Sequence, residues 1–218
     1  MLDFLIESFI EETLFIESMV KIDQLQDNFG LYVRSIGGPN EILFVLYDMD
    51  EVREIQNAKK RHEKNGFRNE FEISTDEMLK AVYGMIQIDS YGGEASRVNE
   101  VLVAAAIKGY GPLMYEIAMS YNPNKFLMAD RGSIKPAAIK VWEYFLDNRS
   151  EEFEIINAPL RRDQKSNIPA LTKAFRILNP INFQTLIDNS KNFNEKFKAD
   201  SLIEELGSNL FKHKYFQS

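Results

Sequence analysis

The segment Lys108-Gly-Tyr-Gly-Pro112 holds the residues best placed for chemistry, because two glycines stand between an apolar stretch and a helical pattern. Glycines let a backbone turn tightly and approach a ligand. The first amides of the following helix would point outward without partners, and Pro112 suits a first helical turn, where a missing amide hydrogen costs nothing. Such a turn can bind an anion such as a pyrophosphate. A Gly-x-Gly turn with a purely structural role is the open alternative.

Charged residues that follow two predicted strands are further candidates for chemistry. Asp89 and Glu94 follow an apolar strand pattern, where a general base could lie, although acidic residues after a strand are usually solvated turn residues. In the stretch Asp130-Arg-Gly-Ser133, Arg131 could contact a phosphate or an acidic substrate group. The alternative for this stretch is an internal Asp–Arg pair followed by a plain helix N-cap.

The remaining basic and histidine residues favour structural interpretations. Arg161-Arg162 lies in a proline-punctuated connection without interleaved aromatics, which indicates a solvated loop rather than a nucleic-acid site. His62 and His213 are far apart in sequence and lack ligand-spaced carboxylates, so both are interpreted as surface histidines. We therefore predict no metal site.

Composition narrows the function further. The 218 residues contain no Cys and two His, and 33 acidic against 26 basic residues give a net charge of −7. The lack of Cys excludes a disulfide scaffold and a cysteine nucleophile. The acidic balance argues against broad nonspecific binding to nucleic acid, with a local basic patch as the open alternative. The N-terminal stretch carries acid where a signal peptide would carry lysine, and no apolar run approaches the roughly 18 residues of a membrane span. A cytoplasmic protein without membrane contact is expected.

The elements that must position these residues follow from periodicity. An amphipathic pattern predicts a docking helix over 2–20, and a long, mostly apolar stretch predicts a buried strand over 98–106. A strand, helix, strand and helix from 98 to about 148 form a βαβα unit, which favours a parallel pair of strands. The other expected elements up to residue 150 are strands at 31–36, 41–47, 81–89 and 125–129, turns at 37–40 and 90–94, and helices at 48–69, 113–121 and 135–145.

The last third of the chain has a different composition. Residues 151–218 are polar and mostly helix-compatible, with helices predicted over 168–178, 183–197 and 201–206, the last ending at Gly207 as its C-cap. The predicted organisation is an α/β (α+β) body over 1–150, including the N-terminal helix, and a mostly helical extension over 151–218. The sheet of the body should be mixed and mostly antiparallel, with helical extensions at both ends.

This order of elements resembles the GNAT superfamily of N-acetyltransferases. In that family a strand ends in the motif Gln/Arg-x-x-Gly-x-Gly/Ala, whose matching stretch here is Ala106-Ile-Lys-Gly-Tyr-Gly111. The resemblance covers about Val98 to Asn148. The stretches Tyr110-Gly-Pro-Leu-Met-Tyr-Glu-Ile-Ala, Ala129-Asp-Arg-Gly-Ser and Val141-Trp-Glu-Tyr are also similar to a GNAT-like set of bacteriophage proteins.

The resemblance implies acetyl-CoA as the cofactor and an amine, or a protein, as the acceptor. Backbone amides from Lys108 to Leu113 would hold the pyrophosphate, and groups near Ala104 to Ala106 would polarise the thioester carbonyl in a cleft between strands ending near Ala105 and Ala129. The implied cofactor-binding residues are Ala104, Ala106, Lys108, Gly109, Tyr110, Gly111 and Leu113.

The sequence departs from the family pattern at its acid–base positions. Ala106 stands where Gln or Arg is expected, and Lys135 and Trp142 stand where the later helix of the family has Asn and Tyr. An indole cannot protonate the leaving thiolate as that tyrosine does. The substitute candidates for catalysis are Tyr110, Tyr144 and Glu94.

Two functions follow from this pattern. The first is an acetyl-CoA-dependent N-acetyltransferase, favoured by the intact glycine turn. The second is a GNAT-like scaffold without catalysis, favoured by the missing Tyr and the missing Gln or Arg. The bacteriophage resemblance would make that scaffold a virion component or a host-directed interaction protein, located in the host cytoplasm or the virion.

Overall fold

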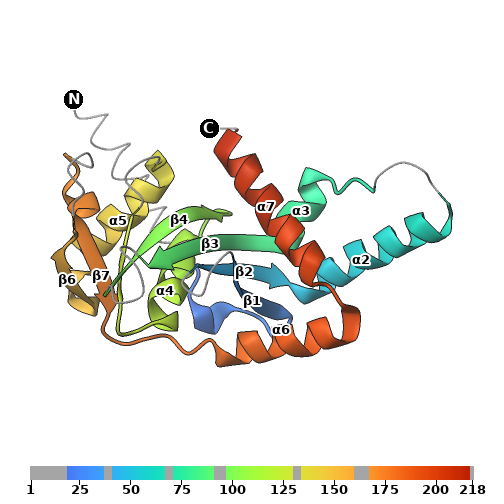
Figure 1. The fold of residues 1–218 in the computed structure, drawn as a ribbon, viewed down its shortest axis with the longest axis horizontal. Coiled ribbons are helices and arrows are strands. Elements are labelled where there is room, and N and C mark those ends of the chain that lie inside the picture. The colour runs from blue at the N-terminus through green and yellow to red at the C-terminus, as the bar shows by residue number, and fades with distance from the viewer. Residues whose placement is uncertain are drawn as a thin grey trace.

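The computed structural model describes residues 19–36, 41–66, 71–90, 97–129, 134–159 and 167–216. Within these ranges seven strands form one mixed sheet in the order β1-β2-β3-β4-β5-β7-β6, and helices pack around it (Figure 1). The α+β class and the mostly antiparallel sheet expected from the sequence are confirmed. No helix in these ranges has the length and apolar character needed to cross a membrane.

The strands are β1 (Phe29–Ser35), β2 (Ile42–Asp48), β3 (Val82–Ser90), β4 (Val98–Ala106), β5 (Phe126–Met128), β6 (Phe153–Asn157) and β7 (Lys173–Ile177). The helices are α2 (Met49–Lys64), α3 (Thr75–Ala81), α4 (Gly111–Tyr121), α5 (Pro136–Asn148), α6 (Gln184–Phe197) and α7 (Asp200–Phe216), with short 3₁₀ helices η1 (Ile22–Gln24), η2 (Ser150–Glu152) and η3 (Pro169–Thr172).

The pairing of β4 changes along its length. On one side it pairs with β3 from Asn99 to Ala106, antiparallel. On the other side it pairs with β5 in parallel, and only over its first three residues, from Val98 to Glu100. The parallel pair predicted from the βαβα order is confirmed. Because β5 is so short, the rest of β4, from Val101 to Ala106, runs on without β5 beside it.

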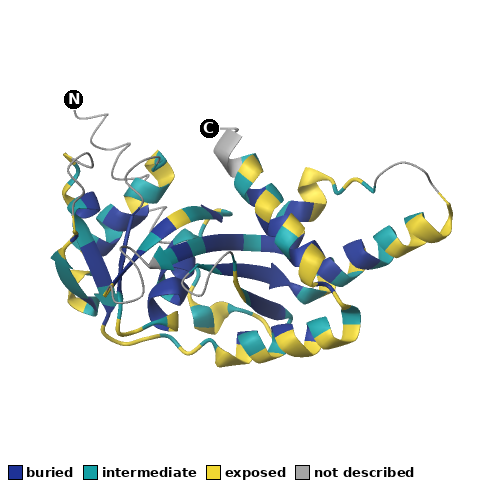
Figure 2. Cartoon of the chain, in the orientation of Figure 1, coloured by how far each residue is buried: buried dark blue, intermediate teal, exposed yellow. Residues whose placement is uncertain are grey.

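The two faces of the sheet bury separate cores, because successive side chains on a strand point to opposite faces. On β2, Phe44 and Leu46 belong to a core cluster with α4 and α5, whereas Val45 and Tyr47 belong to a cluster with α3 and α7. The buried strands lie between these two helical layers (Figure 2). Helix α6 runs beside the edge strand β1 and contributes to both clusters (Figure 1).

The C-terminal third corrects one prediction and adds elements that the sequence did not reveal. The helix expected over 168–178 is wrong: this segment forms η3 and then β7, which lies between β5 and β6. Strand β6 and helix α3 were not anticipated, and α7 continues through Gly207 instead of ending there. Helix α6 confirms the prediction over 183–197. The sheet therefore includes strands on both sides of the predicted boundary at residue 150.

The elements predicted before residue 150 otherwise agree with the structure. Strands β1 to β5 and helices α2, α4 and α5 lie where the periodicity places them, within a few residues. The predicted helix over 2–20, except for its last two residues, lies outside the described residues. So do the turn at 37–40 and residues 91–94 of the second predicted turn.

Candidate functional site

The glycine turn has the conformation that its sequence suggests. Gly109 has a φ of 93°, in the region that favours glycine. The N–H of Tyr110 donates to the carbonyl oxygen of Ile107 (3.1 Å), which closes the turn, and α4 then begins at Gly111. The carbonyl oxygen of Gly109 accepts a hydrogen bond from the N–H of Val20 (3.0 Å), so the chain before η1 is tied to this turn.

The start of α4 leaves two amides available. The first intrahelical bond is donated by the N–H of Met114 to the carbonyl oxygen of Tyr110 (3.2 Å). Pro112 has no N–H, and within the described part of the chain the amides of Gly111 and Leu113 have no acceptor. Such amides, together with the helix dipole, favour an anion at this point.

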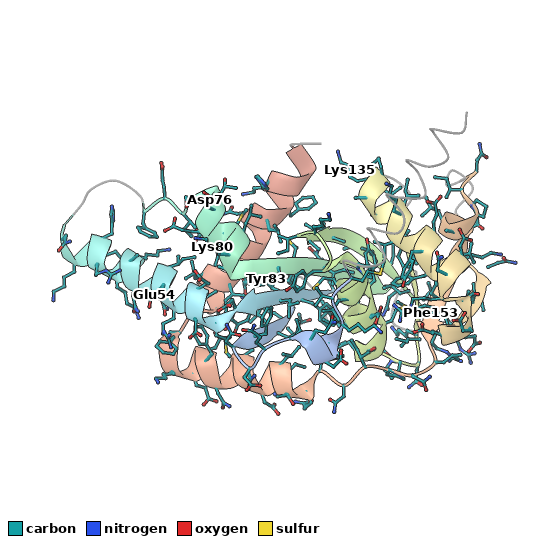
Figure 3. The ribbon with its side chains drawn as sticks, turned by 180° about the vertical axis from the view of Figure 1, so that it is seen from behind. Glu54, Asp76, Lys80, Tyr83, Lys135 and Phe153 are labelled. Atoms are coloured by element: carbon teal, nitrogen blue, oxygen red, sulfur yellow. The ribbon has the colours of Figure 1, made fainter. Side chains whose placement is uncertain are left out.

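A cavity of about 580 Å³ begins at this helix start. Four elements or element pairs contribute to its wall: the β3–β4 pair, α4, α5 and α7. Lys135, at the start of α5, is labelled in Figure 3. The lining residues are Met85, Ala104, Ala105 and Ala106 from the strands, Gly111, Met114 and Tyr115 from α4, Lys135, Pro136, Ala137, Ala138 and Val141 from the start of α5, and Phe211 and His213 from α7.

This cavity is lined from both faces of the sheet. Met85 and Ala105 pack in the core cluster that contains α7, whereas Met114 and Val141 pack in the cluster that contains α4 and α5. A continuous sheet would separate these two sets of side chains. They meet in one cavity because β4 has no β5 beside it after Glu100. The cavity therefore passes through the layer of the sheet at the divergence of β4 from β5.

A second, smaller cavity of about 80 Å³ adjoins it along β4 and the end of β5. Tyr115 and Trp142 both contribute to its wall, and their rings meet edge to face with centroids 5.0 Å apart. Burial raises the pKa of Tyr115, so its hydroxyl stays protonated. The indole Nε1–H of Trp142 is buried and has no hydrogen-bond partner in the described ranges. This site thus contains two neutral donors, a phenol and an indole.

The structure brings together three of the predicted cofactor-binding residues and leaves others aside. Ala104, Ala106 and Gly111 line the large cavity. Lys108 is exposed in the turn next to Gly109, and the Leu113 side chain is buried in the core, so only its backbone can contact a ligand. Glu94, the stretch 130–133 and Arg161-Arg162 lie outside the described residues.

The tyrosines predicted as substitute acids do not line the cavity. The ring of Tyr110 packs on Tyr83 (centroids 4.8 Å apart), which lies on β3 (Figure 3). Tyr144 lies under the guanidinium of Arg149, 5.9 Å from its ring centroid. Burial raises the pKa of both Tyr110 and Tyr144. Their surroundings are therefore aromatic or cationic contacts rather than the cavity wall.

Asp89, considered as a general base, and His62 are also distant from the cavity. Asp89 pairs in register with Glu100, whereas Gly84 pairs with Ala106, so Asp89 lies at the other end of β3. Five residues of strand separate these positions by roughly 17 Å. His62 is at the end of α2, where its ring meets Phe71 (5.6 Å). Neither side chain can act on a ligand in the cavity.

Comparisons with protein-family profiles, curated proteins and solved structures give no match. The geometry of the cavity is therefore the observation on which a function must rest. In the described ranges no group of three or more His, Asp or Glu side chains is placed to hold a metal ion.

The structure adds three residues that sequence reasoning missed: Tyr115, Phe211 and His213. A signal for Tyr115 was present, because it follows Gly111 by four residues and shares its helix face. Phe211 and His213 are about 100 residues beyond the glycine turn, and no local pattern connects them to it. His213 was interpreted as a surface histidine, whereas its partly buried ring lines the cavity.

Proposed function

We propose that the protein is a GNAT-like N-acetyltransferase that moves an acetyl group from acetyl-CoA to an amine. The observation that carries this proposal is the cavity at the β4–β5 divergence, which begins at the glycine turn and the start of α4. The family resemblance of the sequence calls for an anion site and a splayed pair of strands, and these two features adjoin here. A cytoplasmic location fits this chemistry, because acetyl-CoA is an intracellular metabolite.

The pyrophosphate of the cofactor would bind at the start of α4. The amides of Gly111 and Leu113 point out of the helix without acceptors in the described part, and the helix dipole adds to their attraction for an anion. Lys108 lies exposed in the turn that precedes α4, and Lys135 lines the cavity at the start of α5. These local charges matter because the chain as a whole carries a net charge of −7, which repels an anionic ligand.

The pantetheine arm and thioester would follow β4. Between Val101 and Ala106 this strand lacks β5 as a partner, so one row of its backbone groups is available to amides of a ligand. Ala104 and Ala106 present only methyl groups at the cavity, which lets a chain approach the backbone closely. An N–H of this segment would stabilise the oxyanion as the amine nitrogen attacks the carbonyl carbon.

The leaving thiolate needs a proton when the C–S bond breaks. Trp142 occupies the helix position of the family's tyrosine, and its indole cannot supply that proton. Tyr115 lines both cavities, so its hydroxyl is the proton donor that the geometry favours. Burial raises its pKa, which keeps the phenol protonated before the step and makes it a weaker acid than a free phenol. Holding the two reactants together supplies much of the rate enhancement even where acid–base groups are weak.

Calorimetric titration with acetyl-CoA tests this proposal, using two substitutions at Gly111. A Cβ at Gly111 would meet only Val141 Cγ2, at 3.5 Å, an ordinary contact, so alanine fits the fold at this position. We expect wild type and Gly111→Ala to bind. Gly111→Glu should bind on the order of 100-fold more weakly, because its carboxylate repels the phosphates and its side chain enters the cavity. If wild type does not bind acetyl-CoA at high micromolar concentration, the proposal is wrong.

A second function, a GNAT-like interaction protein without catalysis, is favoured by Trp142. This side chain is 1% exposed and packs against Tyr115 and Phe175, so it fills the core where the family places a catalytic group. Such a protein would be a virion component or a host-directed factor if the bacteriophage resemblance holds. Binding of acetyl-CoA without release of free thiol, across a panel of amines, would support this function over the enzyme.

A further inference from the structure

We propose that helix α7 forms the acceptor half of the site, with His213 accepting the proton of the acceptor amine and Phe211 packing against its apolar body. The inference rests on the proposed acetyl transfer and names the class of amine that would be used. The acceptor would be a small primary amine with an aromatic or apolar body, uncharged at neutral pH.

The two halves of the cavity lie on opposite faces of the sheet, which suggests one half for the cofactor and the other for the acceptor. The anion site, Tyr115 and Val141 belong to α4 and α5, on one face. Helix α7 packs on the other face, through Leu202, Leu206 and other buried residues of its own cluster. A cofactor seated at the start of α4 therefore approaches the divergence from one side. The acceptor has to reach the thioester from the side of α7.

The α7 residues at this cavity are Phe211 and His213. His213 is partly buried, and within the described ranges its ring nitrogens have no hydrogen-bond or ion-pair partner. An imidazole is the side chain best suited to accept a proton near neutral pH. Phe211, two residues earlier, adds an apolar surface of the kind that packs against an aromatic ring.

The proposed step balances in atoms and charge. The lone pair of the acceptor nitrogen attacks the acetyl carbonyl carbon, and the nitrogen loses a proton to the imidazole of His213. The C–S bond then breaks with its electron pair on sulfur, and the thiolate takes a proton from the Tyr115 hydroxyl. Proton return from the imidazolium to the tyrosinate, through solvent, restores both side chains. The products are the N-acetylated amine and free CoA.

The charges of the side chains that line the cavity favour a neutral acceptor amine over a cationic one. In the described part of the wall the titratable side chains are Tyr115 from α4, Lys135 from α5 and His213 from α7, and the lining residues of β3 and β4 are Met85 and alanines. No carboxylate is among them. A cationic polyamine would meet the like charge of Lys135, and no described lining residue offers it a negative charge, which disfavours its binding. A neutral arylamine avoids that cost and gains from the apolar wall.

The inference is tested by measuring acetyl transfer by the full chain to 4-methylaniline and to spermidine. The release of free thiol is the signal. We expect turnover of 4-methylaniline in preference to spermidine. His213→Gln should lower kcat on the order of 100-fold or more, while acetyl-CoA affinity stays unchanged. In this variant the rate should no longer decrease as the pH is lowered, because the base whose protonation causes that decrease is absent. Phe211→Ala should raise KM for the amine with less effect on kcat. Lys212→Ala, an exposed change between these two residues, is the matched control.

The outcomes separate this inference from the proposed function. Absence of acetyl-CoA binding by wild type overturns both. If acetyl-CoA binds normally, three results would each overturn the role of α7 and leave the cofactor site standing. These are a preference for spermidine, no turnover of 4-methylaniline, and an unchanged pH profile in His213→Gln. The acetyl-CoA affinity of each variant also reports whether it has folded.

Discussion

Gly84, on β3, tests how closely helix α4 sits on the sheet at the cavity. A Cβ built at Gly84 would lie 2.6 Å from Cγ and 2.8 Å from Sδ of Met114. Carbon atoms in contact prefer about 3.5–4.0 Å, so the Met114 side chain would have to move by roughly 1 Å. Met114 is 1% exposed, and its side chain can yield only by shifting toward the cavity that it lines, which breaks its packing on β3. We expect Gly84→Ala to lower the free energy of unfolding by about 1–3 kcal/mol.

Urea unfolding of a double-mutant cycle measures this contact. Met114→Ala alone should cost about 2–5 kcal/mol, because it leaves a cavity. In the double variant the methyl group added at position 84 enters that space, so the loss should be smaller than the sum of the single losses by about 1 kcal/mol or more. Gly111→Ala is the control, because its Cβ makes only an ordinary contact of 3.5 Å. Wild-type stability for Gly84→Ala, or strict additivity in the cycle, would refute the reasoning.

Two further predictions concern the supports around the site. Arg149 pairs with Glu116 on α4 and Glu152 on η2, at 2.5 Å each. Burial already raises the pKa of Glu116, and Arg149 opposes this rise. Removing the cation in Arg149→Met leaves a buried carboxylate without its partner, so this variant should lose about 3 kcal/mol of unfolding free energy in urea. Adding Glu116→Gln to Arg149→Met should restore part of that free energy. Ser74→Ala should cost about 1 kcal/mol, because Ser74 and Glu77 form the capping box of α3. Hydrogen bonds from Ser74 lower the pKa of Glu77, so the contribution of this carboxylate is complete above pH 4.5 and is lost as pH falls through the lowered pKa. The difference in Tm between wild type and Ser74→Ala should therefore shrink in acid, to the part that comes from the bond of the Glu77 N–H to the Ser74 hydroxyl.

The predictable parts of the fold are those encoded locally. The glycine turn, the strand before it and helix α4 follow one another directly, and the turn conformation depends on Gly109 itself. The segment 168–178 was not predictable in this way. Strand β7 has β5 and β6 on its two sides, and Ala174 and Phe175, which point to opposite faces, are both fully buried. A strand covered on both faces is apolar at successive residues, which periodicity cannot distinguish from a buried helix.

Gly207 shows the same limit in another form. A glycine near the end of a helical pattern predicts a C-cap, and α7 nevertheless continues to Phe216. A Cβ at Gly207 would lie 3.1 Å from Cγ2 of Val45 on β2. The glycine therefore allows a closer contact between helix and sheet than a residue with a Cβ would. Its reason lies about 160 residues away in the chain, where no local pattern can reveal it.

Helix α6 has a consequence for the route by which the chain folds. It covers the edge strand β1: Asn189 donates to the carbonyl oxygen of Phe29 (3.4 Å), and Ser190 bonds to the hydroxyl of Tyr47 (2.8 Å). These partners are 160 and 143 residues apart. The hairpin of β1 and β2 thus emerges from the ribosome long before helix α6 is synthesised. Until then the edge strand β1 is unpaired, which favours self-association. Because such distant contacts slow folding, we expect slow refolding, with yields that fall steeply as protein concentration rises.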